Sequence, residues 1–111
     1  MIEEFPEESI GTVPISQENL KIVQEGMRQT VLSGTGTSLS RIPISSAAKT
    51  GTAQFDARNR NRSHAWFTAY APYEDPQIAI TVLIEDGGEG GINSVPVVRE
   101  ALDWWAKNRY K

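Results

Sequence analysis

Four neighbouring residues near the middle of the chain, Lys49-Thr50-Gly51-Thr52, combine a cation, two hydroxyls and a residue without a side chain. A lysine ammonium binds carboxylates and lowers the pKa of a nearby hydroxyl. Gly51 lets a ligand or another backbone come close. On an edge strand, the backbone N–H of Thr52 can point outward and stabilise an oxyanion. The segment therefore suits holding an anionic group beside an acyl carbon, and the alternative is a polar strand edge with a solvated lysine.

This segment has no convincing nucleophile next to it. One Ser-x-x-Lys spacing occurs, at Ser46-Ala47-Ala48-Lys49. A serine and a lysine three residues apart share a face on a helix, but here they fall on a predicted strand, so Ser46 is not assigned that role. The absence of cysteine excludes thiolate chemistry and disulfides, and a single histidine is too few for an ordinary zinc site. We expect no metal and no cofactor, and for His64 a hydrogen-bonding or capping role rather than a catalytic one.

Two segments have helical periodicity. Residues 16–32 are predicted to form a helix that Ser16 caps. Its apolar face repeats at helical spacing through Leu20, Val23, Met27 and Val31. A second helix is predicted over residues 94–108, with Pro96 in its first turn. Its apolar face comprises Val98, Leu102 and Trp105, with Ala101 beside them. Trp104 and Trp105 are adjacent, so only one of them can face a core.

Between the helices, strands are predicted over residues 46–55, 64–71 and 77–85. The compact turn at residues 72–76 favours antiparallel pairing of the last two strands. Both of these strands are apolar on both faces, which is typical of strands covered on both sides. The predicted fold class is α+β, a three-stranded antiparallel sheet flanked by an N-terminal and a C-terminal helix, one on each face. Residues 1–14 read as an extended acidic arm.

Three loop features point to weaker hypotheses. The Gly-x-Gly in residues 33–40 lacks the Gly-Lys-Ser/Thr of a phosphate loop, so a flexible connection is favoured. The loop before the second strand carries Arg58, Arg60 and Arg62. Without interleaved aromatics or a positive net charge, these arginines do not indicate nucleic-acid binding. A glycine-rich loop adjoins the acidic residues Glu85, Asp86 and Glu89, where a turn is favoured over a cation site.

Size and composition describe one ordinary globular domain. The chain has 111 residues, of which 39% are hydrophobic and 23% charged, and its net charge is −3. No apolar run approaches the roughly 20 residues that cross a bilayer. The acidic N-terminus is not typical of a secretory signal. The absence of cysteine does not settle the compartment.

The order of these motifs resembles a known family. Lys49–Gln54, then His64–Pro72, then an apolar strand ending at Gly88 and a closing amphipathic helix resemble the C-terminal end of penicillin-binding transpeptidases. The resemblance covers residues 15–109 and is nearest to the class B, elongation type. In that superfamily Lys-Thr-Gly is the third active-site motif, after Ser-x-x-Lys and Ser-x-Asn.

The resemblance implies a role for each residue of the motif. Lys49 would act electrostatically beside the nucleophile and orient the catalytic hydroxyls. The hydroxyls of Thr50 and Thr52 would hold the C-terminal carboxylate of a D-Ala-D-Ala stem peptide, or that of a β-lactam. The backbone N–H of Thr52 would supply half of the oxyanion hole, and Gly51 would let the strand lie close to the cleft. Lys49 and Thr52 are thus the implied catalytic residues, and Lys49 to Thr52 the implied substrate-binding residues.

The chain also departs from the family pattern, because it contains no Ser-x-Asn. We expect the first two motifs upstream, outside this chain, so that residues 15–111 form the C-terminal portion of a transpeptidase domain and are inactive alone. The resemblance implies peptidoglycan stem peptides and β-lactams as partners, no nucleic acid, and a parent anchored in the inner membrane with an extracytoplasmic domain. The open edge of the third strand predicts self-association. The alternatives are a non-catalytic module that binds a carboxylate or D-Ala-D-Ala ligand, and an unrelated scaffold.

Overall fold

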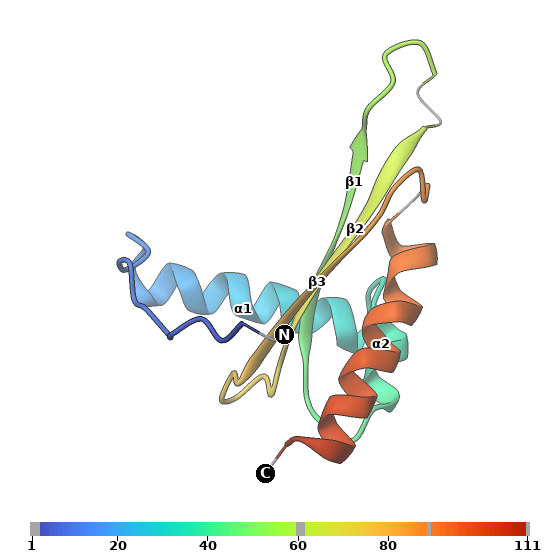
Figure 1. The fold of residues 1–111 in the computed structure, drawn as a ribbon. Helices are drawn as coiled ribbons and strands as arrows, with labels where there is room; N and C mark the ends of the chain where they lie inside the picture. The colour runs from blue at the N-terminus through green and yellow to red at the C-terminus, as the bar shows by residue number, and fades with distance from the viewer. Residues whose placement is uncertain (1–2, 60–61, 89, 111) are drawn as a thin grey trace.

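The computed structural model describes residues 3–59, 62–88 and 90–110, and for residues 90–92 it describes the backbone only. Figure 1 shows a narrow sheet between two helices. In chain order the elements are α1 (Gln17–Leu32), a 3₁₀-helix η1 (Thr37–Arg41), β1 (Ala47–Gln54), β2 (Ser63–Ala71), β3 (Ile78–Ile84) and α2 (Gly90–Asn108). The predicted fold class is confirmed, and the observed strand bounds lie within one residue of the expected ones.

The sheet is antiparallel and has the order β1-β2-β3, so β2 is central and β1 and β3 are the two edges of the described sheet. Its register aligns Lys49 with Thr68 and Thr68 with Thr81 across the three strands. The next row joins Gly51, Trp66 and Leu83. Because directly paired residues point to the same side of a sheet, both rows lie on one face. We call this the lysine face.

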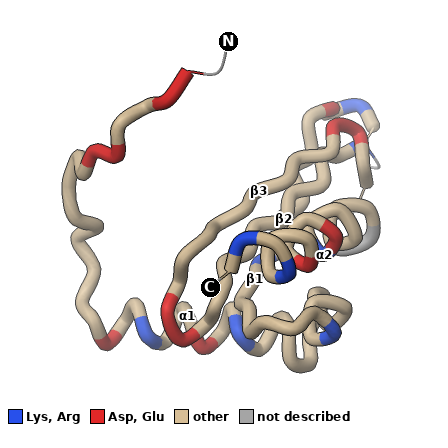
Figure 2. Tube along the Cα trace, turned by 60° about the horizontal axis from the view of Figure 1, so that its bottom comes forward, with Lys and Arg blue, Asp and Glu red and all other residues tan. Residues whose placement is uncertain are grey.

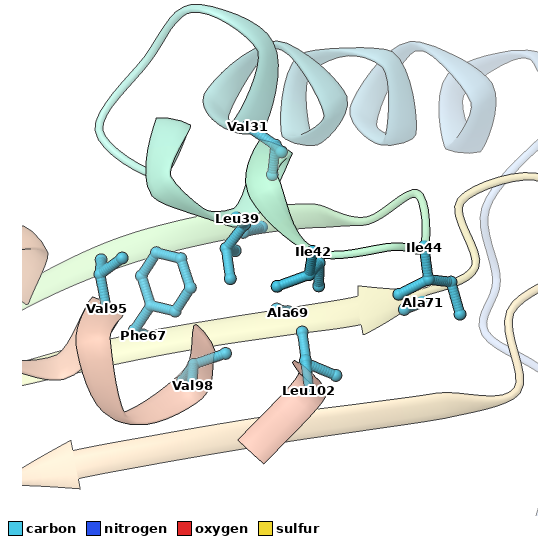
Figure 3. Packing of buried hydrophobic residues seen from close by; sticks show 11 residues of the cluster. Val31, Leu39, Ile42, Ile44, Phe67, Ala69, Ala71, Val95, Val98 and Leu102 are labelled. Carbon is cyan, nitrogen blue, oxygen red and sulfur yellow. The ribbon is translucent and has the colours of Figure 1, made fainter. Parts of the chain in front are cut away.

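The opposite face of the sheet carries the core. Along β2 the buried residues alternate with more exposed ones, which fixes the register of the whole sheet. Figure 3 shows Phe67 of β2 beside Val95 and Val98 of α2, with Leu102 of α2 near Ala69 of β2. The full cluster of buried residues is Val31, Leu39, Ile42, Ile44, Ala48, Phe67, Ala69, Ala71, Val95, Val98 and Leu102. The predicted inner face of the C-terminal helix is confirmed, and Trp105 packs against this cluster while Trp104 stays exposed.

Helix α1 reaches the core only with its last turn. Ser16 caps it, because its Oγ accepts a hydrogen bond from the backbone N–H of Asn19 at 3.1 Å. The helix runs across the sheet at β1 and contacts β1 and η1 (Figure 1). Val31 is fully buried, but Val23 is 52% exposed. The predicted apolar face of this helix is therefore only partly covered by the described residues.

Three details of the sequence-based prediction are wrong. Helix α2 begins at Gly90 rather than at residue 94, so the glycines of the expected loop enter a helix and Pro96 lies inside it. Part of the loop expected over residues 33–40 is the 3₁₀-helix η1. The sequence predicted a helix on each face of the sheet, but the lysine face is only partly covered, as the 40% exposure of Trp66 and the 42% exposure of Leu83 show. The reason is that α2 packs on the core face, whereas α1 contacts only β1 among the strands.

Residues 3–16 form neither helix nor strand. In Figure 2 this arm passes along the outside of the molecule and carries several acidic residues. Its apolar residues Phe5, Ile10 and Val13 are all exposed. The arm thus adds little to the core. Among the residues that the structure describes, no helix combines the length and the apolar character that crossing a membrane requires.

Candidate functional site

The Lys-Thr-Gly segment lies in the middle of β1, at an edge of the sheet. Lys49 is exposed, and its Nζ donates a hydrogen bond to the carbonyl oxygen of Thr50 at 2.6 Å. Its neighbour Ala48 belongs to the buried core. Alternation along the strand therefore directs Lys49 to the lysine face, where its ammonium lies against the backbone of its own strand.

A shallow depression of about 310 Å³ adjoins the lysine. Residues from all three strands line it: Lys49, Thr50, Gly51, Trp66, Phe67, Thr68 and Thr81. At its floor the Oγ1 atoms of Thr68 and Thr81 lie 2.9 Å apart, and Thr68 Oγ1 donates to the carbonyl of Ile80 at 3.3 Å. The depression thus combines a cation, hydroxyls and the indole of Trp66, a set that fits an anionic ligand with an apolar portion.

Gly51 packs closely against Trp66, its partner across the sheet. A Cβ atom placed on Gly51 would lie 3.3 Å from the Cβ of Trp66, which is tighter than ordinary van der Waals contact. The absence of a side chain therefore lets Trp66 sit directly against the β1 backbone. The sequence predicted the close approach of a ligand or another backbone at Gly51, and that stays a prediction, because the neighbour seen here is a side chain of the next strand.

The structure separates the lysine from the two threonines. Thr50 pairs with Phe67 and Thr52 with Ala65, so both hydroxyls belong to the side of the sheet opposite Lys49. Thr52 is exposed and does not line the depression. Since β1 is an edge strand, a ligand lying along its rim can still contact side chains from both faces.

Ser46, the serine of the formal Ser-x-x-Lys spacing, is fully buried just before β1. Its Oγ has no hydrogen-bond partner among the described residues. A nucleophile must be accessible to its substrate, so the structure supports leaving Ser46 out of the candidate site.

The outer end of β1 is tied to the end of β3 by a charged and aromatic cluster. Arg62 donates to the carboxylate of Asp86, with Nη2 3.1 Å and Nε 3.3 Å from Oδ2. The hydrogen bond to Asp86, and then its negative charge, raise the pKa of Arg62. The guanidinium also lies 4.8 Å from the ring centre of Phe55, which stacks on His64 at 4.3 Å. His64 Nδ1 accepts the backbone N–H of Asp86 at 3.0 Å, so the imidazole has the hydrogen-bonding role that the sequence favoured.

The remaining loop candidates do not form a ligand site in the described chain. Arg60 and Glu89 lie outside the described residues. Among the residues that the structure describes, no three histidine, aspartate or glutamate side chains are grouped so that they could hold a metal ion. Asp86 is engaged by Arg62, so the turn that carries it is held by an ion pair.

At the other end of the sheet, two titratable groups have altered pKa values. Burial, and then the neighbouring Tyr73, raise the pKa of Tyr70. The buried Tyr70 hydroxyl has no hydrogen-bond partner in the part of the chain that the structure describes. Glu74 accepts a hydrogen bond from Ser45 Oγ. That bond, followed by one from the backbone of Glu74, lowers the pKa of the Glu74 carboxyl. Arg28 lies over the Tyr73 ring and donates to the carbonyl of Ser46 at 2.7 Å, which fastens α1 to the start of β1.

Sequence reasoning did not assign to the site the three residues of β2 and β3 that line the depression from the lysine face, namely Trp66, Thr68 and Thr81. The signal for them was present, because the short turn at residues 72–76 and the alternation of β2 and β3 together set the register. Extending that register to β1 would have placed all three beside Lys49 and Gly51.

Comparisons with known proteins show which family the chain is similar to. A family model described as the penicillin binding protein transpeptidase domain matches residues 2–103. The peptidoglycan D,D-transpeptidase MrdA of Haemophilus influenzae is 37% identical over 75 residues, which cover 57% of this chain and 12% of that protein. PbpA of Mycolicibacterium smegmatis, also named a peptidoglycan D,D-transpeptidase, is 44% identical over 62 residues, covering 50% and 13%. The chain thus spans only about an eighth of these relatives.

Solved structures give the same result for the fold. The penicillin-binding protein PBP2 of Helicobacter pylori superposes with a TM-score of 0.74 at 33% identity, over 88% of this chain and 19% of that one. PBP2 of Pseudomonas aeruginosa, solved in complex with WCK 5153, gives a TM-score of 0.75 at 32% identity, over 97% and 24%. The three strands and two helices therefore match part of a larger domain.

Proposed function

Because the chain belongs to the penicillin-binding protein transpeptidase domain family, we propose that it is the C-terminal part of a peptidoglycan D,D-transpeptidase domain and supplies that domain's Lys-Thr-Gly strand. The observation that carries this proposal is the position of the motif. Lys49 is exposed on an edge strand beside a depression, with Gly51 closing directly onto Trp66. An edge strand leaves one side of its backbone open to a ligand.

In the proposed reaction, the hydroxyl of a serine outside this chain attacks the carbonyl carbon of a D-Ala-D-Ala stem peptide. The terminal D-Ala leaves, and the amine of a second stem peptide then takes the acyl group from the serine. Lys49 would stabilise charge near the nucleophile, and the hydroxyls of Thr50 and Thr52 would bind the terminal carboxylate. The backbone N–H of Thr52 would stabilise the tetrahedral oxyanion. By the same family membership we propose an extracytoplasmic location for the parent domain.

This proposal predicts that the 111-residue chain does not react covalently with a β-lactam, because it lacks the acylated serine. Incubation with a fluorescent penicillin followed by mass spectrometry of the intact chain tests it. The expected spectrum contains only the unmodified mass. A penicilloyl adduct on any serine of the chain would show that a nucleophile lies within it and would overturn the assignment as a non-acylating part.

A second candidate is a non-catalytic module that binds a carboxylate ligand reversibly. The exposed ammonium of Lys49 beside the rim of β1 favours it. The test is calorimetric or NMR titration with a peptide ending in D-Ala-D-Ala, comparing the wild type with Lys49→Met. Lys21→Met, on the exposed side of α1, is the matched control. Binding that Lys49→Met abolishes and Lys21→Met preserves supports the module, and absence of binding supports an inert part of the larger domain.

We further propose that the isolated chain self-associates through β3. Its outer edge is unpaired in the described sheet, and Ile78–Ile84 contains no charge and no proline to discourage strand addition. Light scattering at micromolar concentration is expected to detect a dimer or larger species, which Ala79→Lys should shift towards monomer. A wild-type chain that remains monomeric would contradict this proposal without bearing on the transpeptidase assignment.

A further inference from the structure

Four residues at the outer end of the sheet form a closed ring of contacts, which we call the Asp86 ring: Phe55, Arg62, His64 and Asp86. The Asp86 carboxylate binds the Arg62 guanidinium. The guanidinium lies over Phe55, and Phe55 stacks on His64 with their planes 13° apart. The ring closes where His64 Nδ1 accepts the backbone N–H of Asp86. Each residue comes from a different place: Phe55 follows β1, Arg62 precedes β2, His64 lies in β2 and Asp86 follows β3.

The turn that carries Asp86 is itself firmly placed. Asp86 has a φ of 51°, a left-handed conformation that aspartate and asparagine adopt more readily than most residues. Two further bonds dock this turn on β2, from the N–H of Gly88 to the carbonyl of Ser63 at 3.2 Å and from Ser63 Oγ to the carbonyl of Gly88 at 2.9 Å. These bonds fix the position of the turn relative to β2, so the Asp86 carboxylate binds Arg62 at a defined place.

The ring also reaches the connection beyond β1. Asp56 Oδ2 lies 3.6 Å from Arg62 Nη1, and Asp56 Oδ1 accepts the backbone N–H of Arg58 at 2.9 Å. Arg62 thus contacts two consecutive residues: its guanidinium lies over the Phe55 ring and near the Asp56 carboxylate. These two residues continue the lysine strand directly past Gln54 and line a second depression of about 370 Å³ with Gln54 and Ala57.

We propose that Asp86 and Arg62 are positioning residues for the lysine strand: through the Asp86 ring they hold the backbone of residues 53–58 in place relative to β2 and β3. That this affects binding of a stem peptide rests on the proposed function, in which the strand and its continuation border the substrate. The positioning itself does not depend on that function.

The exposure of the ion pair determines what kind of effect to expect. The side chains of Arg62 and Asp86 are 47% and 51% exposed, and ion pairs of this kind add little to overall stability. A local role is therefore expected to appear as local opening rather than as a change in the unfolding transition. Arginine suits this role better than lysine, because its planar fork binds a carboxylate while its flat face stacks on an aromatic ring.

Hydrogen exchange of the backbone amides in the 111-residue chain tests the proposal. Asp86→Asn keeps a residue that tolerates the left-handed turn and keeps the N–H to His64, but it removes the charge. Arg62→Lys keeps the charge and removes the fork. The matched control is Asp103→Asn, which breaks the exposed ion pair between Asp103 and Lys107 on α2.

Both ring variants are expected to exchange the described amides of residues 53–58 about five-fold faster than the wild type, while amides of α2 change less than about two-fold. The control should leave residues 53–58 unchanged. The double variant should exchange no faster than Arg62→Lys, because that substitution already breaks the interaction that Asp86→Asn removes.

Unchanged exchange at residues 53–58 would overturn the proposal, and so would an equal increase over α2, which would indicate a general loss of stability. Titration with a D-Ala-D-Ala peptide separates this inference from the proposed function. If the wild type binds the peptide and Arg62→Lys weakens binding at least three-fold, the link between positioning and substrate binding is supported. If Arg62→Lys exchanges faster but binds the peptide as the wild type does, that link is rejected and the proposed positioning role stands. If the wild type binds no peptide, ligand binding by the isolated chain fails, while the exchange data still decide the positioning.

Discussion

The two faces of β2 differ in their surroundings. On the core face Phe67 is fully buried beneath α2, whereas on the lysine face Trp66, its neighbour in sequence, is 40% exposed. Lys49 and the depression lie on this second face. The fold is thus held together mainly from one side of the sheet, and Lys49 lies on the other. Substitutions of adjacent residues should therefore affect different properties of the molecule.

The largest difference is expected between Phe67→Ala and Trp66→Ala. Removing a fully buried phenylalanine lowers the free energy of unfolding by about 3–5 kcal/mol, through lost burial and the cavity left behind. Trp66→Ala, on the same strand, should cost less than about 1.5 kcal/mol, because much of the side chain already contacts water. Urea unfolding followed by circular dichroism measures both. Equal losses would show that the lysine face is as important for stability as the core face.

A smaller and opposite effect is expected at Tyr70, whose buried hydroxyl finds no hydrogen-bond partner among the residues described. Tyr70→Phe removes that unpaired group and should raise the free energy of unfolding by about 1 kcal/mol. Because burial raises the pKa of Tyr70 in the folded chain, the wild type should also lose stability as the pH rises above about 10, where the unfolded tyrosine ionises.

Thermal unfolding of the two proteins at pH 8 and in the alkaline range checks this prediction for Tyr70. Tyr70→Phe should lose less stability than the wild type at high pH. A destabilised Tyr70→Phe would mean that the hydroxyl has a stabilising partner, such as a bound water.

A third prediction concerns the candidate chemistry itself. Lys49→Met should change the free energy of unfolding by less than about 0.5 kcal/mol, since the residue is exposed and its ammonium donates a hydrogen bond to a backbone carbonyl of its own strand. Unfolding measured beside Lys21→Met provides the comparison. A loss above about 1.5 kcal/mol for Lys49→Met alone would place the lysine among the residues that hold the fold.

The smallest effect is expected at Glu74, in the turn between β2 and β3. The hydrogen bond from Ser45 lowers its pKa, so the folded state binds this proton less readily than the unfolded state. Its stabilising contribution is present above the ordinary value of 4.5 and is lost as the pH falls below it. Glu74→Gln should therefore flatten the decline in melting temperature between about pH 5 and pH 3. An identical decline in both proteins would contradict the prediction.

Local patterns predicted much of the fold. Alternation in β2 and β3, with the short turn at residues 72–76, was enough for the antiparallel pairing, and the cap at Ser16 marked the start of α1. The start of α2 was missed because glycines at 90 and 91 favour a loop. Most of the stability of a helix comes from packing, here of Val95 and Val98 in the core cluster. Local propensity has no access to that tertiary contribution.

The candidate site was predictable only in part. The residue types of Lys49-Thr50-Gly51-Thr52 indicated the chemistry, and the edge position of β1 follows from the strand order. The Asp86 ring could not be predicted, because Phe55, Arg62 and Asp86 meet only through the lengths and shapes of two connections. The exposure of Trp66 was missed because an apolar strand does not reveal which of its faces has a covering element.

The pairing of Ala48 with Ala69 restricts how this protein can vary in length. One extra residue between Ala48 and Lys49 would turn the lysine towards α2 and bring its neighbour outward, whereas two extra residues would restore its direction. An insertion after Asp56, in the connection to β2, would leave every strand residue on its present side. Insertions after Asp56 should therefore leave the facing of the strand residues unchanged in any number, whereas within β1 only even numbers would do so.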